Sequence, residues 1–174
     1  MSQYTTDQIL DMIETHGGPK GLDLSGKDLS GIDLSAQTAT EKAVGYRQAR
    51  GDWPAWYSPN TKGINLSGAR LWETKLTKAD LSRADLSGAI LAGASLHSVY
   101  MPSVNLEGAV MVGAHFEGAD LTDANMRGTN LRRAHLRGST LTGADLSGAN
   151  LTGAHVGPEQ LQSARSLEGA HLNP

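Results

Sequence analysis

Residues 144–158 read ADLSGANLTGAHVGP, and this stretch places Ala144 and Ala149 five positions apart. Leu146 and Leu151 each follow one of these alanines by two residues. A period of five matches neither the 3.6-residue repeat of a helix nor the two-residue alternation of a strand. The stretch therefore predicts a repeat whose unit is an extended step followed by a bend.

The same register continues from Ile64 to Pro158, with an apolar residue at the centre of each unit from Leu66 to Val156. Residues two apart in an extended step point to one face, so the alanine and the central residue both point inward. The next two residues turn a corner, and glycine makes that turn easy. We expect stacked coils with a narrow interior, paired through their backbones about 4.8 Å apart.

Outward positions repeat every twenty residues, which predicts four five-residue sides per coil. Stepping by fifteen from Gly68 instead reaches Arg83 and Ser98. Two columns carry the twenty-residue period: Gly68, Gly88, Gly108, Gly128 and Gly148, and Asn65, Asp85, Asn105, Asn125 and Asp145. The asparagine column keeps its aspartates apart, which avoids stacking like charges.

Several units are close to the form A(D/N)LXX and resemble the repeats of the pentapeptide-repeat protein family. They include ADLSG at 84–88 and 144–148, ADLTD at 119–123 and ANLTG at 149–153. The resemblance covers residues 21–36 and 64–157. It implies an all-β solenoid, namely a right-handed quadrilateral parallel β-helix of pentapeptide repeats.

Both ends of the solenoid are predicted to carry short capping helices. Thr5-Thr6-Asp7-Gln8 fits a capping box, Ile9, Met12 and Ile13 share a helical face, and Gly17-Gly18-Pro19 ends this helix, predicted over 6–16. Gly157-Pro158-Glu159 starts a second helix, with Leu161 and Ala164 on its inner face, and Ala170-His171-Leu172 resembles one more repeat step.

We therefore expect five segments along the chain. They are an N-terminal cap (1–20), the first repeats (21–36), an aromatic insertion loop (37–63), the main β-helix (64–157) and a C-terminal cap (158–174). The insertion breaks the register, because Leu34 and Leu66 are 32 positions apart.

Composition excludes several classes of protein. The net charge of −3 and the pI near 6.0 give no field strong enough to imply a nucleic-acid or membrane partner. The chain has no cysteine, so it has neither a disulfide framework nor a thiolate zinc site. The polar start MSQYTTDQ is unlike a secretory signal, and we expect a cytoplasmic protein.

His115, His135 and His155 form a column twenty residues apart, with Ser95 one coil below. A metal site needs imidazoles that converge on one point, whereas a straight outward column places its rings in a row. A Ser95–His115 nucleophile pair lacks a carboxylate and an oxyanion pocket. With no enzyme motif elsewhere, we predict no catalytic, cofactor-binding or metal-binding residue and no cofactor.

A basic cluster of arginines gives a nucleic-acid interpretation little support. Its members are Arg127, Arg132, Arg133 and Arg137. They lie on different sides of the coil instead of forming one stripe. Glu107 lies one coil from Arg127 and Glu117 one coil from Arg137, so we expect two cross-coil ion pairs.

One side of the coil breaks the rule of polar outward positions. Trp72, Ile90, Ala92, Val110 and Val112 are predicted to form an apolar patch over three coils. A monomer seldom leaves such a patch bare. We predict that Trp53, Trp56 and Tyr57 of the insertion fold over it. The alternatives are a dimer or partner surface framed by the insertion, and an isolated run of surface aliphatic residues.

These observations favour a non-enzymatic structural or interaction protein, a monomer or weak homodimer whose partner is another protein or a second copy. Some members of the resembled family inhibit DNA gyrase by imitating duplex DNA, which is the alternative function. Such mimicry requires dense negative charge. Residues 61–157 carry eight acidic and nine basic residues, a net charge of +1, which disfavours that alternative.

Overall fold

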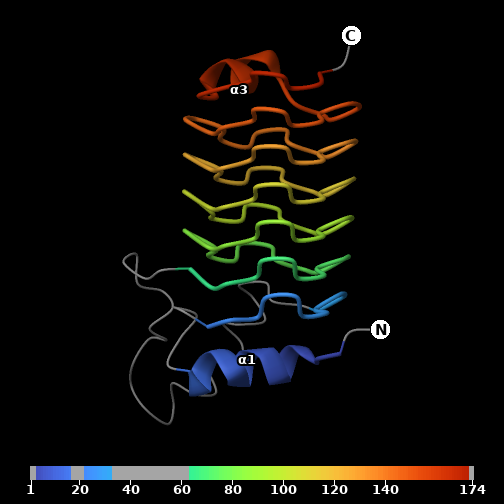
Figure 1. The fold of residues 1–174 in the computed structure, drawn as a ribbon, viewed down its shortest axis with the longest axis vertical. Helices are drawn as coiled ribbons and strands as arrows, with labels where there is room; N and C mark the ends of the chain where they lie inside the picture. Colours follow the sequence, from blue (N-terminus) through green and yellow to red (C-terminus); the bar gives the residue numbers. More distant parts are fainter. Residues whose placement is uncertain (1–2, 17–21, 33–62, 173–174) are drawn as a thin grey trace.

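The computed structural model describes residues 3–16, 22–32 and 63–172 of the 174-residue chain. Stacked coils rise between helix α1 (Thr6–Thr15) and helix α3 (Pro158–Ser163) (Figure 1). The predicted helix stop at Gly17-Gly18-Pro19 and the aromatic residues of the insertion lie outside the described residues.

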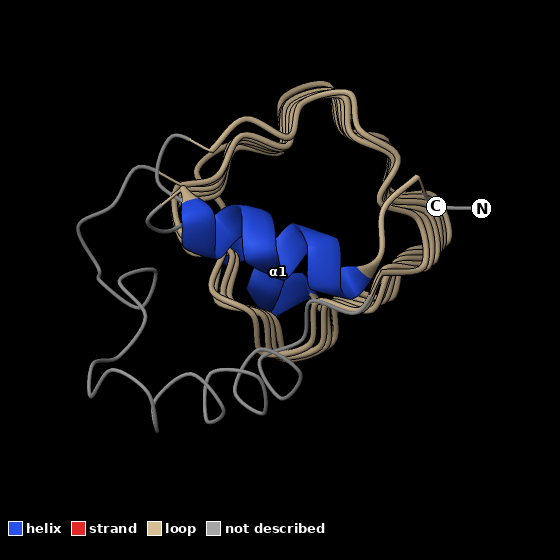
Figure 2. Cartoon of the chain, turned by 90° about the horizontal axis from the view of Figure 1, so that it is seen from below, coloured by secondary structure: helices blue, strands red, loops and turns tan. Residues whose placement is uncertain are grey.

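Four sides make one coil, as the twenty-residue spacing predicts. Parallel bridges join residues twenty apart, such as Asn65 to Asp85 and Ile90 to Val110. In each bridge, backbone N–H groups donate both up and down the stack: Leu66 N lies 2.7 Å from Asp85 O, and Asp85 N lies 3.0 Å from Ile64 O. The end view shows the resulting four-sided outline (Figure 2).

The described part of the chain contains isolated bridges instead of continuous strands. The chain turns a corner every five residues, so each side leaves one residue in bridge geometry before the next bend. The all-β prediction therefore needs this refinement: the backbone between coils is paired as in a parallel sheet, but each pairing is one residue long.

The interior contains the two columns that the repeat predicts. Every central residue from Leu66 to Leu151 is buried, and almost every alanine two residues before a centre is buried with it. Three of these small positions hold a hydroxyl instead. The hydroxyls of Thr74, Thr129 and Ser139 donate to backbone carbonyl oxygens at 3.1, 2.8 and 2.7 Å, so no described hydroxyl in this column is left unsatisfied.

The corners use left-handed backbone two residues after each centre. Glycine adopts this conformation without strain, as at Gly88 with a φ of 63°. Seven other residues also adopt it: Glu73, Lys78, Arg83, Ser98, Ser103, Asp123 and Arg133. Asparagine or aspartate before the centre supports the turn, because Asp85 Oδ1 accepts a 3.0 Å hydrogen bond from Ser87 N.

The insertion separates the first two coils in the sequence. Asp23 pairs with Asn65, which is 42 positions along the chain, whereas neighbouring coils elsewhere in the repeat are 20 positions apart. The segment between Ile32 and Gly63 is therefore 22 residues longer than a coil requires. Ile32 remains in the stack, because its carbonyl accepts a 2.9 Å hydrogen bond from Lys75 N.

Helix α1 lies across the end of the stack (Figure 2). The capping box is confirmed: Gln8 Oε1 accepts from Thr5 N at 2.8 Å, and Thr5 Oγ1 accepts from Gln8 N at 3.2 Å. Ile9 is fully buried and Met12 packs against the core. Neither α1 nor α3 is long and apolar enough to cross a lipid bilayer.

Helix α3 replaces one side of the last coil. Leu161 and Ala164 pack against the core, as predicted, and Gln160 Nε2 donates to Leu136 O at 2.6 Å and Ser139 O at 2.7 Å. Pairing then resumes after one extra residue, because Asn150 bridges His171, 21 positions on. The predicted last repeat step at 170–172 is thereby confirmed.

Asp145 joins the C-terminal cap to the stack. This buried carboxylate lies 3.2 Å from Arg165 and 3.3 Å from Arg127. The predicted Arg127–Glu107 pair is therefore wrong, because Glu107 accepts from Asn125 instead. Hydrogen bonds from the Ser147 hydroxyl and N–H hold the pKa of Asp145 well below its usual value; burial opposes them, and Arg165 and Arg127 add to the lowering.

Changing the size of an inward side chain should destabilise the fold. Ala114→Leu adds atoms to a fully buried position and should cost about 1–3 kcal/mol, while Leu136→Ala leaves a cavity and should cost about 2–5 kcal/mol. Urea denaturation measures both. Ala92→Leu, at an outward position, is the matched control. Unchanged stability in both inward variants would show that the columns are misassigned.

Asp145→Asn should lower the free energy of unfolding by about 1–3 kcal/mol at neutral pH. The folded pKa lies below the unfolded value of about 3.9, so the stabilisation is complete above that value and disappears as the pH falls through the folded pKa. The difference from wild type in urea denaturation should therefore shrink below about pH 4. The exposed Glu168→Gln serves as control; an equal loss there would contradict the assignment.

Candidate functional site

The apolar patch lies on one side of the coil, over three successive levels. Bridges connect Arg70 to Ile90 and Ile90 to Val110, so these outward residues stack directly. Trp72 is 50% exposed, whereas Ile90, Ala92, Val110 and Val112 are partly exposed. The five residues of the predicted patch thus lie on one side of the coil, and Trp72 is the most exposed of them.

Polar residues surround the patch above and below. Val110 bridges Asn130 on the next level, and Arg132 is exposed there; Arg70 lies below Ile90. Ser30 lies on the level below Trp72, because Gly31 N donates to Trp72 O at 2.8 Å. The described part of this coil ends at Ile32, two residues after Ser30.

The predicted insertion, 37–63, follows this coil in the sequence. Its residues Trp53, Trp56 and Tyr57 lie outside the described residues, so the predicted cover over the patch stays a prediction.

The adjoining side carries the histidine column that the sequence predicts. His115 bridges His135, which bridges His155, and both pairs have ring centroids 4.6 Å apart. The first pair is stacked and the second is edge to face. His97 extends the column downward, because its ring stacks on His115 with centroids 5.4 Å apart.

Glu117 lies among these rings. Its carboxylate oxygens are 3.3 Å from His97 Nε2, 3.5 Å from His115 Nδ1 and 3.7 Å from His135 Nδ1. The predicted Glu117–Arg137 ion pair is not formed. Burial raises the pKa of Glu117, but its own backbone N–H, a hydrogen bond from His115 and the charges of His97 and His115 outweigh that effect and leave the pKa below its usual value.

The Ser95 side chain contacts His97. It forms no hydrogen bond with His115, the partner that the twenty-residue spacing suggests. Its Oγ lies 3.0 Å from His97 Nδ1 and 3.2 Å from Thr77 Oγ1. Ser95, His97 and Glu117 thus form a chain of a hydroxyl, an imidazole and a carboxylate. Acyl transfer would also need hydrogen-bond donors for an oxyanion and a cavity for the substrate. The pocket lined by His155 lies at the other end of the histidine column from Ser95.

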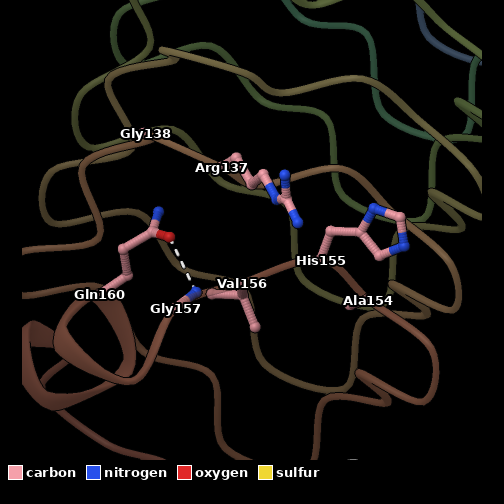
Figure 3. A pocket seen from close by; sticks show the side chains of 7 residues that line it. All are labelled: Arg137, Gly138, Ala154, His155, Val156, Gly157 and Gln160. Carbon is pink, nitrogen blue, oxygen red and sulfur yellow. Dashed lines mark hydrogen bonds between the residues drawn. The ribbon is translucent and has the colours of Figure 1, made fainter.

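A pocket of about 300 Å³ lies beside the C-terminal cap (Figure 3). Arg137, His155 and Gln160 are among the residues that line it, and Gln160 is joined to Gly157 by a hydrogen bond (Figure 3). Gln160 is committed to the fold, because its Oε1 accepts from Gly157 N at 2.9 Å and its Nε2 donates to Leu136 and Ser139. The polar groups left for a ligand are Arg137 and His155.

The sequence pattern did not single out His97 and Glu117 as neighbours of the column. Both lie one residue after a central residue and are twenty apart, whereas the column lies one residue before. Positions two apart on one side are adjacent on its outer surface, which is the signal that identifies this cluster. Tyr100, 51% exposed on the fourth side, was also not predicted.

Several solved structures align with this chain. A pentapeptide-repeat protein from Nostoc PCC 7120 aligns at 24% identity with a TM-score of 0.50, over 82% of this chain and 98% of its own. One from the Arabidopsis thaliana thylakoid lumen aligns at 34% identity with a TM-score of 0.44, over 52% of this chain; the match spans 59% of that protein. QnrB1, a plasmid-mediated fluoroquinolone resistance protein, aligns at 20% identity with a TM-score of 0.37. This alignment covers 90% of this chain and 76% of QnrB1.

A search of curated proteins gave no match. The family model of pentapeptide repeats matches in eight copies, over residues 64–101, 103–138 and 119–156, which together exceed half of the chain. Most of the bridged residues lie within this range. The chain belongs to the pentapeptide-repeat family.

Proposed function

We propose that this protein is a non-enzymatic interaction scaffold that binds another protein, or a second copy of itself, through the apolar patch. The observation that supports this proposal is the position of Trp72: a half-exposed indole beside stacked aliphatic side chains on a rigid wall. Aromatic residues with an apolar surround and a polar rim are typical of protein interfaces.

The wall itself favours binding over catalysis. Bridges at Ile90 and Val110 hold the backbone of this side in place, so little backbone ordering is needed when a partner docks. We also infer that the coils wind in the right-handed sense implied by the family resemblance. The aromatic insertion would frame the surface and contribute Trp53, Trp56 and Tyr57 to it.

A DNA-mimicking, gyrase-binding protein is the alternative, and the charge of the repeat argues against it. The four arginines of the basic cluster, Arg127, Arg132, Arg133 and Arg137, are all exposed. Their charges offset the acidic residues, giving the net charge of +1 over residues 61–157. A surface that replaces DNA phosphates needs a dense array of negative charge.

Val110→Lys should abolish binding through the patch, because it places an ammonium group at the centre of the apolar surface. The measurements are affinity capture from native host cells and the oligomeric state by light scattering. We expect loss of a captured protein or of a dimer, with the melting temperature and tryptophan fluorescence unchanged. Thr140→Lys, at the equivalent partly exposed position of another side, is the control.

Two results would contradict this proposal. If Val110→Lys shifts tryptophan fluorescence to the red while the protein stays monomeric and captures the same proteins, the insertion covers the patch. If fluorescence, stability, assembly and capture are all unchanged, the patch is an ordinary part of the surface.

Supercoiling by DNA gyrase should be unaffected by this protein at micromolar concentration, since the repeat lacks the charge of a DNA mimic. An agarose-gel supercoiling assay with increasing protein tests this expectation. Inhibition that increases with protein concentration would favour the alternative function over the scaffold.

A further inference from the structure

Three side chains from two successive coils converge on the histidine side. One ligand-type atom from each of His97, His115 and Glu117 can be chosen so that all three lie within 4.8 Å of one another. A straight column of imidazoles does not converge, and the sequence therefore predicts no metal site. Glu117 changes this geometry, because its carboxylate lies between rings that belong to different levels.

The separations are those expected for ligands of a common cation. Glu117 Oε2 is 3.3 Å from His97 Nε2, and Oε1 is 3.5 Å from His115 Nδ1. Hydrogen bonds between nitrogen and oxygen are usually about 2.7–3.2 Å long. Zinc bonds of about 2.0–2.2 Å separate two ligands of a tetrahedral site by about 3.3–3.5 Å.

One carboxylate oxygen is shielded from solvent without a hydrogen bond. Oε2 of Glu117 accepts no hydrogen bond within the described part of the chain, although His97 Nε2 is within ion-pair distance of it. The orientation of that pair is unsuitable for a hydrogen bond. An anionic oxygen in this position is stabilised by a cation that both atoms can reach.

Ser95 orients the ring of His97. With the hydroxyl accepting from Nδ1–H at 3.0 Å, the imidazole presents the lone pair of Nε2 to the Glu117 carboxylate. In this tautomer Nε2 and the Glu117 oxygen are both acceptors, 3.3 Å apart, and a cation bound by both would remove their repulsion. A metal-ligating histidine commonly donates its other N–H to a nearby oxygen in this way.

We propose that His97 Nε2, His115 Nδ1 and the Glu117 carboxylate bind a divalent transition-metal ion of the zinc class. Two imidazoles and one carboxylate are a ligand set that Zn²⁺ accepts, with a fourth position open to water. His135 stacks on His115 and orients its ring. The His97 and Glu117 side chains are 44% and 34% exposed, so an ion can enter from solvent and the side chains can close on it.

Zinc titration of protein without a polyhistidine tag, after treatment with a chelator, tests the site. Isothermal titration calorimetry should show one saturable site, and the melting temperature should rise with added Zn²⁺ because the ion binds the folded chain. His97→Ala, His115→Ala and Glu117→Gln should each weaken the affinity at least about tenfold. Circular dichroism checks that these outward substitutions leave the fold intact.

His155→Ala is the matched control. It removes an imidazole from the same column, but His155 meets the ring of His135 edge to face, and the ion pairs of Glu117 are made with other histidines. Losses of affinity of about tenfold or more are expected when a ligand, or a group that holds a ligand, is removed. His155 is neither, so we expect the affinity of this variant to stay close to that of wild type.

Three results would overturn the proposal. The first is no saturable binding of Zn²⁺, Ni²⁺ or Cu²⁺ up to about 10⁻⁴ M, a concentration far above the dissociation constants of structural zinc sites. The second is an equal loss of affinity in His155→Ala. The third is unchanged affinity in both His97→Ala and Glu117→Gln. Imidazole ¹⁵N spectra supply a second readout. On zinc addition, Nε2 of His97 and Nδ1 of His115 should shift as ligating nitrogens, while the His155 signals stay in place.

Discussion

The narrow interior of the coil is the constraint on which the rest of the structure depends. Each side admits one small and one large inward side chain, and Ala114 and Phe116 show both sizes fully buried in the same side. With these columns filled, two residues of every five are committed to the core. The remaining positions must bridge, turn or face solvent, and this division of roles explains why so few of them are free to carry chemistry.

The backbone conformation follows from the same constraint. A side of five residues must close within a short distance, so the corner uses a left-handed residue, usually glycine. Where Arg83 or Arg133 occupies that corner, the strain is borne by hydrogen bonds between coils, such as Arg133 N to Thr152 O at 3.0 Å. The stack holds each corner in place, and the corner in turn keeps the columns aligned.

Much of the fold could be predicted from sequence, because the period is regular. The spacing of twenty, the inward columns and the cap at Thr5 and Gln8 follow from rules that act over a few residues.

The ion pairs could not be predicted so well. Arg127 has acidic neighbours on the coils above and below, and only the side-chain geometry shows that it selects Asp145 over Glu107. On the histidine side, the column was visible as a spacing of twenty, whereas the position of Glu117 among the rings depends on side-chain direction across two adjacent columns. The aromatic insertion was visible as a break in register, but its 22 surplus residues have no period, so no spacing rule indicates where its tryptophans lie.

The twenty-residue coil also has a consequence for how such a chain changes over generations. Duplication of twenty residues adds one coil to the stack and leaves every outward column on its own side. Duplication of five residues rotates every later residue by one side of the coil. Imidazoles or an indole beyond that point would then lie on a different side, while the core remained filled. Gene rearrangement can therefore redistribute surface groups in steps of five without a new fold, and only multiples of twenty preserve an existing site.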